Sequence, residues 1–375
     1  MEALFQGFLS LTWQQAVMIG IGLTLVWLAV AKEYEPSLLL PMGFGTVLVN
    51  IPMTAALTQV MDGTVVPGAI SVLFDAGIAN EMFPLLIFIG IGAMMDFSPV
   101  MERPVYALFG LTAQAGIFLT MGLAYYVFGF SVREAASIGI IGAADGPTSI
   151  FVSSRFAPQL LGPISVAAYS YMSMVPVIQP PVVRALTTKE ERRMNMTLRA
   201  GRTVSKRARI LFPIVVTIVV GIFAPSSSTL IGFLMFGNLL RESGVVARLS
   251  NSAQNELANI VTIMLGLGIS CTMTGDRFLR ADTLMILGMG LVAFVFDTAG
   301  GVLSAKLLNL FMKEKINPMI GAAGISAFPM SSRTIQQMAA REKPGTFVLM
   351  QASAANVAGQ IGSVVAGGLL LALLS

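Results

Sequence analysis

The residues best suited to chemistry begin with one carboxylate in an apolar stretch. Asp145 lies in IGAADGPTSIF (141–151), beside glycines and a proline. A carboxylate in a membrane interior costs several kcal/mol unless its charge is compensated. Asp-Gly-Pro is also a common turn sequence, so a helix-capping or membrane-boundary acid is the alternative. Because apolar sequence continues on both sides, the cost of the charge favours a functional acid.

A second segment of the same kind carries neutral oxygens and a cation. INPMIGAAGISAFPMSSR (316–333) contains Asn317 and Ser326 and ends on Arg333. Its prolines, like the one after Asp145, remove backbone donors and leave carbonyl groups free. One carboxylate with amide, hydroxyl and carbonyl oxygens suits a hard monovalent cation, which favours Na⁺ over Ca²⁺ or Mg²⁺. Arg333 either snorkels to the membrane interface or binds an anionic group such as a carboxylate.

Two further acids lie in or beside apolar runs. Asp96 opens DFSPVMER (96–103) at the end of such a run, which indicates an interfacial position. Asp297, in AFVFDTAGG (293–301), is either a second buried site or the end of a span. The sequence leaves both interpretations of Asp297 open.

Polar side chains on two other apolar stretches could face the same site. The stretches are VAAYSYMSMVPVIQPP (166–181) and ASAANVAGQIGSVVAGG (352–368). Their polar residues are Tyr169, Ser170, Tyr171 and Ser173 in the first, and Asn356, Gln360 and Ser363 in the second. The second set falls at helical spacings, on roughly one face. Small residues in both stretches also fit close helix packing, which is the simpler interpretation.

The composition identifies the environment of these segments. Of 375 residues, 55% are hydrophobic and 11% are charged, whereas about a quarter of a soluble domain is charged. The chain has no His and a single Cys, which excludes His-based zinc sites, a His general base and an internal disulfide. Apolar runs of about twenty residues recur. The sequence therefore predicts an all-α polytopic membrane protein.

The apolar runs predict a series of membrane helices. These cover about 17–31, 37–56, 83–100, 104–130, 159–179, 210–224, 228–240, 257–274, 281–311 and 346–374. Two shorter stretches, 135–152 and 317–332, are interrupted by Gly and Pro, so we expect broken or re-entrant segments there. The mixed stretch 57–80 predicts a surface loop with an interfacial helix.

Positive charge is concentrated in one loop. Residues 184–209 contain nine Lys/Arg and two Asp/Glu, a net charge of +7, against +4 for the whole chain. The positive-inside rule places this loop in the cytoplasm. Docking of an acidic cytoplasmic partner is a second, weaker interpretation of its charge. Because the excess of positive charge comes from this loop alone, the basic composition of the chain argues against nucleic-acid binding. The loop divides the chain into 1–183 and 210–375.

An internal repeat relates these two parts. NEMFPLLIFIGIG (80–92) recurs as NELANIVTIMLGLG (255–268), and IGAADG (141–146) recurs as IGAAGI (320–325), at nearly one offset. Ser-Ser-Arg follows in each part. Internal duplication is typical of transporters, whose binding sites commonly lie where two broken segments meet. The repeats are inverted if each has an odd number of spans.

Four motifs resemble the membrane β subunit of the biotin-dependent, sodium-pumping decarboxylases. That family includes enzymes for oxaloacetate, methylmalonyl-CoA, glutaconyl-CoA and malonate. The motifs are GIIGAADGPTSIFVSSRFAP (139–158), AAYSYMSMVPVIQPP (167–181), NELANIVTIMLGLG (255–268) and INPMIGAAGISAFPMSSR (316–333). The similarity covers essentially the whole chain, and the motifs are long and specific.

The resemblance implies a carboxybiotin decarboxylase that exports Na⁺ across the cytoplasmic membrane. A soluble carboxyltransferase moves a carboxyl group onto biotin, which a carrier partner holds and this chain does not. The β subunit then decarboxylates carboxybiotin, consumes a proton and exports Na⁺. The implied architecture is elevator-like, with two repeats that each contain a re-entrant hairpin. The implied assembly is a homotrimer with the carrier and carboxyltransferase subunits and a small membrane anchor subunit.

The resemblance also implies functional residues, position by position. These are Asp145, Tyr171, Asn317, Gly321, Ser326, Arg333, Asn356 and Ser363. All except Arg333 are implied around Na⁺. Asp145, Tyr171 and Ser326 are also implied in catalysis, where Tyr171 and Ser326 would relay the proton. Arg333 would attract the carboxyl group of carboxybiotin.

The last span departs from the family pattern at three positions. The family has a His and a Gly-Pro pair shortly before the residue that matches Asn356. This sequence has Gln351, Ala354 and Ala355 in those places. It therefore lacks a titratable group and a helix break there, which affects the expected geometry around Asn356 and the coupling to Na⁺.

Two other functions fit the residues less completely. A secondary transporter would use the same Na⁺ site to drive uptake of an organic anion, with Arg333 binding its carboxylate. A membrane scaffold that only anchors a soluble enzyme would have no need of a buried acid. Dependence on a biotinylated partner separates the pump from the transporter.

Overall fold

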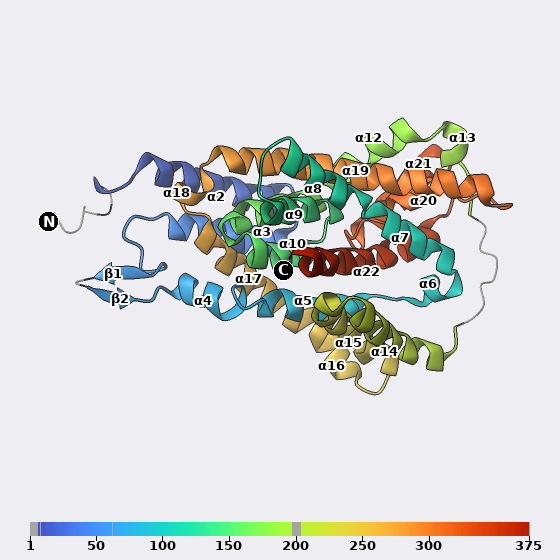
Figure 1. Ribbon diagram of the computed structural model, residues 1–375, viewed down its shortest axis with the longest axis horizontal. Coiled ribbons are helices and arrows are strands. Elements are labelled where there is room, and N and C mark those ends of the chain that lie inside the picture. The colour runs from blue at the N-terminus through green and yellow to red at the C-terminus, as the bar shows by residue number, and fades with distance from the viewer. Residues whose placement is uncertain (1–6, 8, 62, 197–203, 375) are drawn as a thin grey trace.

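The fold is known from a computed structural model that describes residues 7, 9–61, 63–196 and 204–374. It is a helical bundle, elongated in Figure 1, in which the antiparallel ribbon β1 (Gln59–Met61) and β2 (Thr64–Val66) projects at one end. The elements before the connection at 187–205 are α2 (Trp13–Ala31), α3 (Pro36–Val49), α4 (Ala69–Gly77), α5 (Met82–Met94), α6 (Ser98–Glu102), η1 (Pro104–Tyr106), α7 (Ala107–Ala113), α8 (Ala115–Tyr126), α9 (Val132–Gly139), η2 (Ile140–Ala143), α10 (Gly146–Phe156), η3 (Pro158–Leu160), α11 (Leu161–Ser173) and α12 (Val175–Leu186).

The second series of elements begins within that connection. It comprises α13 (Lys189–Arg192), α14 (Lys206–Phe223), η4 (Pro225–Ser227), α15 (Ser228–Ser243), α16 (Ala247–Ser252), the π-helix η5 (Ala253–Leu257), α17 (Ala258–Ile269), η6 (Ser270–Thr272), α18 (Gly275–Phe278), α19 (Ala281–Phe311), α20 (Met319–Ala322), α21 (Met330–Glu342) and α22 (Leu349–Leu374). Part of the basic loop predicted at 184–209, namely 197–203, lies outside the described residues.

The predicted class, an all-α polytopic membrane protein, is confirmed. Within the described residues, five helices are long and apolar enough to cross a membrane, or up to seven if each of two bent pairs counts as one span. The bent pairs are α4 with α5, at 63°, and Pro158–Ser173 with α12, at 68°. The long helix α19 begins and ends at the predicted residues, 281 and 311.

Several predicted boundaries are wrong, and proline explains two of them. The segment 159–179 was predicted as one helix but bends after Met174, where Pro176 stands at the start of α12 and has no N–H for the preceding turn. The span predicted at 37–56 ends at Val49, just before Ile51 and Pro52, because a residue that precedes proline disfavours the helical conformation. The helix expected within 57–80 is α4, and a β-ribbon precedes it.

Glycines let helices from distant parts of the chain approach closely. A Cβ atom on Gly92 of α5 would lie 1.8 Å from the carbonyl oxygen of Leu234 in α15. A Cβ atom on Gly237 of α15 would likewise lie 2.0 Å from the carbonyl oxygen of Ile89. Side chains larger than hydrogen would therefore force α5 and α15 apart, as in other membrane helix pairs with small residues at the contact.

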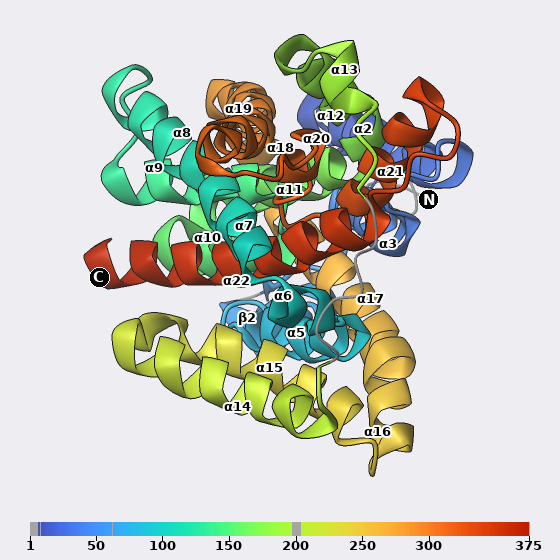
Figure 2. The same ribbon diagram turned by 90° about the vertical axis from the view of Figure 1, so that its right-hand side faces the viewer.

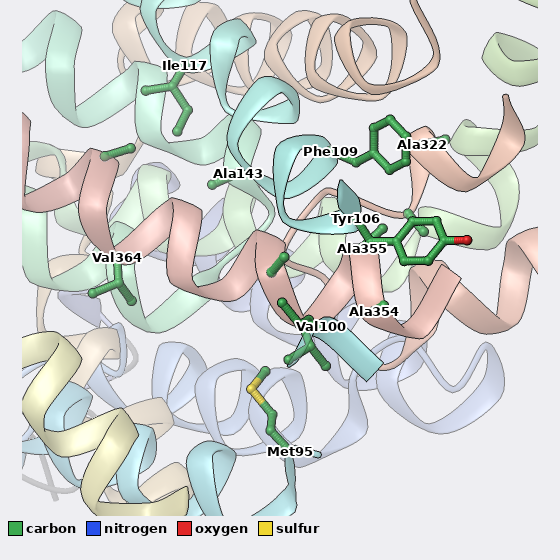
Figure 3. Close-up of a cluster of buried hydrophobic side chains, with 14 of the residues drawn as sticks. Met95, Val100, Tyr106, Phe109, Ile117, Ala143, Ala322, Ala354, Ala355 and Val364 are labelled. Atoms are coloured by element: carbon green, nitrogen blue, oxygen red, sulfur yellow. The ribbon is translucent and has the colours of Figure 1, made fainter. Parts of the chain in front are cut away.

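The C-terminal helix α22 crosses the interior of the molecule (Figure 2). Ala354, Ala355 and Val364 of this helix belong to the largest buried apolar cluster, together with Val100 and Tyr106 (Figure 3). Small side chains on α22 allow α7 and the two broken segments to pack against it. This central position lets α22 contribute polar side chains to the site.

Candidate functional site

Helix is interrupted within the first segment predicted as broken, 135–152, which runs from α9 to α10. Ser131 and Glu134 form a reciprocal capping box that starts α9. The chain then passes through the tighter 3₁₀ helix η2, and Ala144 adopts a left-handed conformation with φ 53°. Asp145 is the N-cap of α10, with Pro147 in the first turn, the arrangement that Asp and Pro favour at a helix start. The carboxylate is thus fixed at an interruption of the helix.

Helix is likewise interrupted within the second predicted segment, 317–332. The short helix α20 ends at Ala322, and α21 begins at Met330 after a turn that contains a cis peptide bond before Pro329. The tips of the two segments meet, because the N–H of Ser326 donates to the carbonyl oxygen of Ala143 over 2.9 Å. Two stretches about 180 residues apart in the sequence therefore form one site.

Asp145 is almost completely buried, with 2% of its surface exposed. Its Oδ2 atom accepts hydrogen bonds from Thr148 Oγ1 at 2.6 Å, Gln360 Nε2 at 2.6 Å and Ser363 Oγ at 2.7 Å. Its Oδ1 atom accepts one longer bond, from the N–H of Thr148 at 3.3 Å. Hydrogen bonds from α10 and α22 thus compensate the carboxylate at a place where an unpaired charge is costly.

A cavity of about 530 Å³ opens beside this carboxylate. Asp145, Ser326 and Arg333, all predicted site residues, lie on its wall. Gln360 and Tyr169 also line the cavity. Because Arg333 is exposed while Asp145 is buried, the cavity has a positive group toward solvent and an acid at depth. This polarity suits an anionic ligand at the outer end and a cation at the inner end.

Two predicted residues, one of them Ser326, make hydrogen bonds at the tip of the second segment. Ser326 Oγ donates to the carbonyl oxygen of Gly359 over 2.8 Å, and Asn356 Nδ2 donates to that of Ile325 over 2.6 Å. The Oδ1 atom of Asn356 is buried and accepts no hydrogen bond from the described residues. A buried amide oxygen in that condition is available to a cation or a water molecule.

Other predicted residues do not line the cavity. The Tyr171 hydroxyl donates to the carbonyl oxygen of Leu287 in α19. Asn317 Nδ2 donates to the carbonyl oxygen of Met194 over 2.9 Å and thereby ties the second segment to the connection after α13. Gly321 packs against α19, where a Cβ would lie 1.9 Å from the carbonyl oxygen of Gly301. Close packing therefore accounts for the glycine.

Glu35 on the cavity wall and Thr148 beside the carboxylate were missed from the sequence, whereas Tyr169 and Gln360 were named only as polar residues that could face the site. Gln360 had been placed with Asn356 and Ser363 on one helical face, since it lies four residues after the first and three before the second. Thr148 had a usable signal, because the third residue after an N-cap Asp is the usual donor to its side chain. Glu35 and Tyr169 reach the cavity only through the tertiary packing of α3 and α11.

The structure places the two further acids, of which the sequence left only Asp297 open. Asp297 is fully buried in the middle of α19, with its carboxylate against Gly116 and Gly142, so it is not the end of a span. Asp96 follows the end of α5, and its Oδ1 accepts from the N–H of Ser98 over 2.9 Å, which agrees with a position at the end of a span.

The three unusual residues of the last span lie at the start of α22. Gln351, Ala354 and Ala355 are buried, and the helix is continuous from Leu349 past Asn356. The chain thus has an unbroken helix at the position where the family pattern predicts a break.

Comparison with known proteins gives one family over nearly the whole chain. The model of the family described as "Na+-transporting oxaloacetate decarboxylase beta subunit" matches residues 14–374. The chain is 49% identical to methylmalonyl-CoA decarboxylase subunit beta of Veillonella parvula, over 98% of this chain and 95% of that protein. It is 49% identical to glutaconyl-CoA decarboxylase subunit beta of Acidaminococcus fermentans, with the same coverage. It is 44% identical to oxaloacetate decarboxylase beta chain 2 of Salmonella typhi, over 99% of this chain and 98% of that protein.

Proposed function

Because the chain belongs to the β subunits of the Na⁺-transporting decarboxylases, we propose that Asp145 binds the transported Na⁺ at the inner end of the cavity. The chain is a multi-pass membrane protein that couples decarboxylation to Na⁺ export as part of a biotin-dependent, multi-subunit decarboxylase. The observation that carries the site assignment is one cavity wall that combines a buried carboxylate, Ser326 and Arg333.

The inner end of the cavity supplies oxygen ligands of the kind that Na⁺ takes. Asp145 provides the charge, the Ser363 hydroxyl contacts its carboxylate, and Ser326 offers a second hydroxyl on the same cavity wall. The Oδ1 atom of Asn356, which has no donor among the described residues, supports a ligand from α22. Asn317 and Gly321 contribute indirectly, because they hold the second segment in position. Asn317 does so through its hydrogen bond to Met194, and Gly321 through its close packing against α19.

The outer end of the cavity receives carboxybiotin from the partner subunit. The Arg333 guanidinium attracts its carboxylate through charge and paired hydrogen-bond donors. Cleavage of the N–C bond releases CO₂ and leaves a biotin nitrogen that takes up one proton. Ser326, on the cavity wall, is placed to pass that proton from water. Tyr171, whose hydroxyl faces α19, takes part only when the packing of α11 against α19 changes.

The two series of elements support an architecture of two repeats. α5 and α17 carry the repeated stretches 80–92 and 255–268, and each packs on a helix of the other series, α5 on α15 and α17 on α3. α8 packs on α9 and α19 packs on α20, which brings one long or paired span against each broken segment. We infer an elevator-like exchange of access, in which the broken segments move together with the Na⁺ site. The basic loop 184–209 faces the cytoplasm, where the carrier and carboxyltransferase subunits dock, and the chain forms a trimer with a small anchor subunit.

Titration of carboxybiotin decarboxylation with NaCl against KCl tests this function. The purified complex should show saturable activation by Na⁺ and none by K⁺ at equal ionic strength. An equal rate of decarboxylation with and without Na⁺ would contradict the coupling of decarboxylation to Na⁺ transport. Na⁺-driven uptake of an organic anion by the β chain alone, without decarboxylation, would make the protein a secondary transporter instead.

A further inference from the structure

We propose that Gln360 acts as a latch, a side chain that competes with Na⁺ for Asp145 and thereby sets the affinity of the pump for Na⁺. This inference rests on the proposed function of Asp145 as the Na⁺ ligand. It adds a positioning residue from α22, on the same cavity wall as Asp145.

The geometry around Asp145 is asymmetric. Three side chains, those of Thr148, Gln360 and Ser363, donate to Oδ2 at 2.6, 2.6 and 2.7 Å. Oδ1 accepts only one bond, at 3.3 Å. Short hydrogen bonds to a carboxylate are the strong, charge-assisted kind. The donors therefore hold the negative charge at Oδ2, and a cation that coordinates this atom has to displace at least one of them.

The three donors differ in how they respond to a cation. Thr148 belongs to α10 and moves with Asp145. The Ser363 hydroxyl can rotate and offer a lone pair to the ion from the same position. The amide nitrogen of Gln360 carries only donors, so it cannot turn to offer a lone pair to a cation at Oδ2 as a hydroxyl can. Of the two donors from α22, Gln360 is the one that lines the cavity. It is thus the group that an arriving ion displaces.

Removal of the amide donor should increase the affinity for Na⁺. Gln360→Met keeps the approximate length of the side chain and abolishes the hydrogen bond. The arrangement with Gln360 on Oδ2 loses a charge-assisted bond, whereas the Na⁺-bound arrangement loses none. We expect the half-saturating Na⁺ concentration to fall at least about threefold. Gln360→Asn, which retains an amide but is one methylene too short to reach Oδ2, should shift it in the same direction.

Two readouts measure the effect. The first is the Na⁺-dependent rise in unfolding temperature of the full chain in detergent, which reports binding without turnover. The second is the Na⁺ dependence of decarboxylation by the assembled complex at constant ionic strength. The matched control is Gln336→Met, because the Gln336 amide also makes two hydrogen bonds, to Thr346 and Val348, but does not line the cavity. Its half-saturating Na⁺ concentration should equal that of the unaltered protein.

An unchanged half-saturating concentration in both Gln360 variants would refute the latch. An increase would also refute it and would make Gln360 a ligand that turns its carbonyl oxygen toward the ion. Asp145→Asn separates this outcome from failure of the proposed function. If that variant retains Na⁺ binding, the site assignment is wrong. If it loses Na⁺ binding while the Gln360 variants behave normally, only the latch is wrong.

Discussion

At the scale of single residues, Asp145 is compensated by hydrogen bonds rather than by a basic partner. Among the described residues its contacts are hydroxyl, amide and backbone N–H groups. Neutral donors lower the cost of a buried charge without fixing a permanent counter-ion in the site. A carboxylate held in this way can exchange its donors for a monovalent cation and recover them after release.

The guanidinium of Arg333 should contribute recognition of the carboxyl group rather than Na⁺ binding. Arg333→Lys keeps the positive charge but removes the paired, planar donors. We expect the KM for carboxybiotin to rise about tenfold, from the loss of about 1.5 kcal/mol of a charge-assisted contact, while the half-saturating Na⁺ concentration stays constant. Initial-rate kinetics in both substrates measure the two quantities separately.

Arg341→Lys is the control for this substitution, because Arg341 is an exposed arginine of the same helix, α21, and does not line the cavity. Its kinetics should match those of the unaltered protein. A change in Na⁺ dependence without a change in KM for Arg333→Lys would place this residue at the cation instead.

The sequence indicated which residues share the cavity better than it indicated their contacts. Asp145, Ser326 and Arg333 stand out because an acid, a hydroxyl and a guanidinium interrupt apolar sequence with Gly and Pro, and the structure places them on one cavity. Asn317 shows what could not be predicted. Its hydrogen bond to Met194 joins residues 123 positions apart, and a sequence pattern carries no information about such a pair.

At the scale of elements, glycines decide how closely α22 approaches the second broken segment. A Cβ on Gly359 of α22 would lie 2.1 Å from the carbonyl oxygen of Gly324. The carbonyl of Gly359 itself accepts from Ser326 Oγ. The contact therefore combines backbone packing with a hydrogen bond to a predicted site residue.

Gly359→Ala should separate α22 from the tip of the second segment. The added methyl group meets backbone, which cannot turn aside as a flexible side chain would. We expect a loss of stability of about 1–3 kcal/mol and a loss of most decarboxylation activity, since Ser326 would move. Thermal unfolding in detergent and the rate of the complex measure both effects.

Gly288→Ala provides the matched control in α19. A Cβ at Gly288 meets nothing within 4 Å, and alanine favours the helix by about 0.5–1 kcal/mol over glycine. Equal loss of stability in the two variants would contradict the packing argument.

The elements themselves were predictable where local chemistry decides them. Gly and Pro marked both broken segments, and the uninterrupted apolar run of α19 gave its bounds. The bend of 68° after Met174 was missed, because the apolar run continues through it. The early end of α3 was missed for the same reason. Apolar composition reports burial in a membrane, whereas the path of the backbone depends on single prolines and on tertiary contacts.

At the scale of the whole molecule, the two series of elements interleave. α3 contacts α17, and α5 contacts α15, across the connection at 187–205. The connection is also fastened at its start, where Arg192 pairs with Glu342 of α21 over 2.9 Å. The basic loop divides the sequence into two parts, whereas the packing joins them. Hydropathy and charge could not predict this interleaving of the two series.

We expect one buried carboxylate, that of Asp145, to couple decarboxylation to Na⁺ transport. Accumulation of ²²Na⁺ by proteoliposomes that contain the complex, measured together with CO₂ release from carboxybiotin, tests it most directly. The unaltered protein should accumulate Na⁺ in proportion to the CO₂ released, and Asp145→Asn should abolish both. Accumulation of Na⁺ driven by decarboxylation in the Asp145→Asn complex would contradict the account.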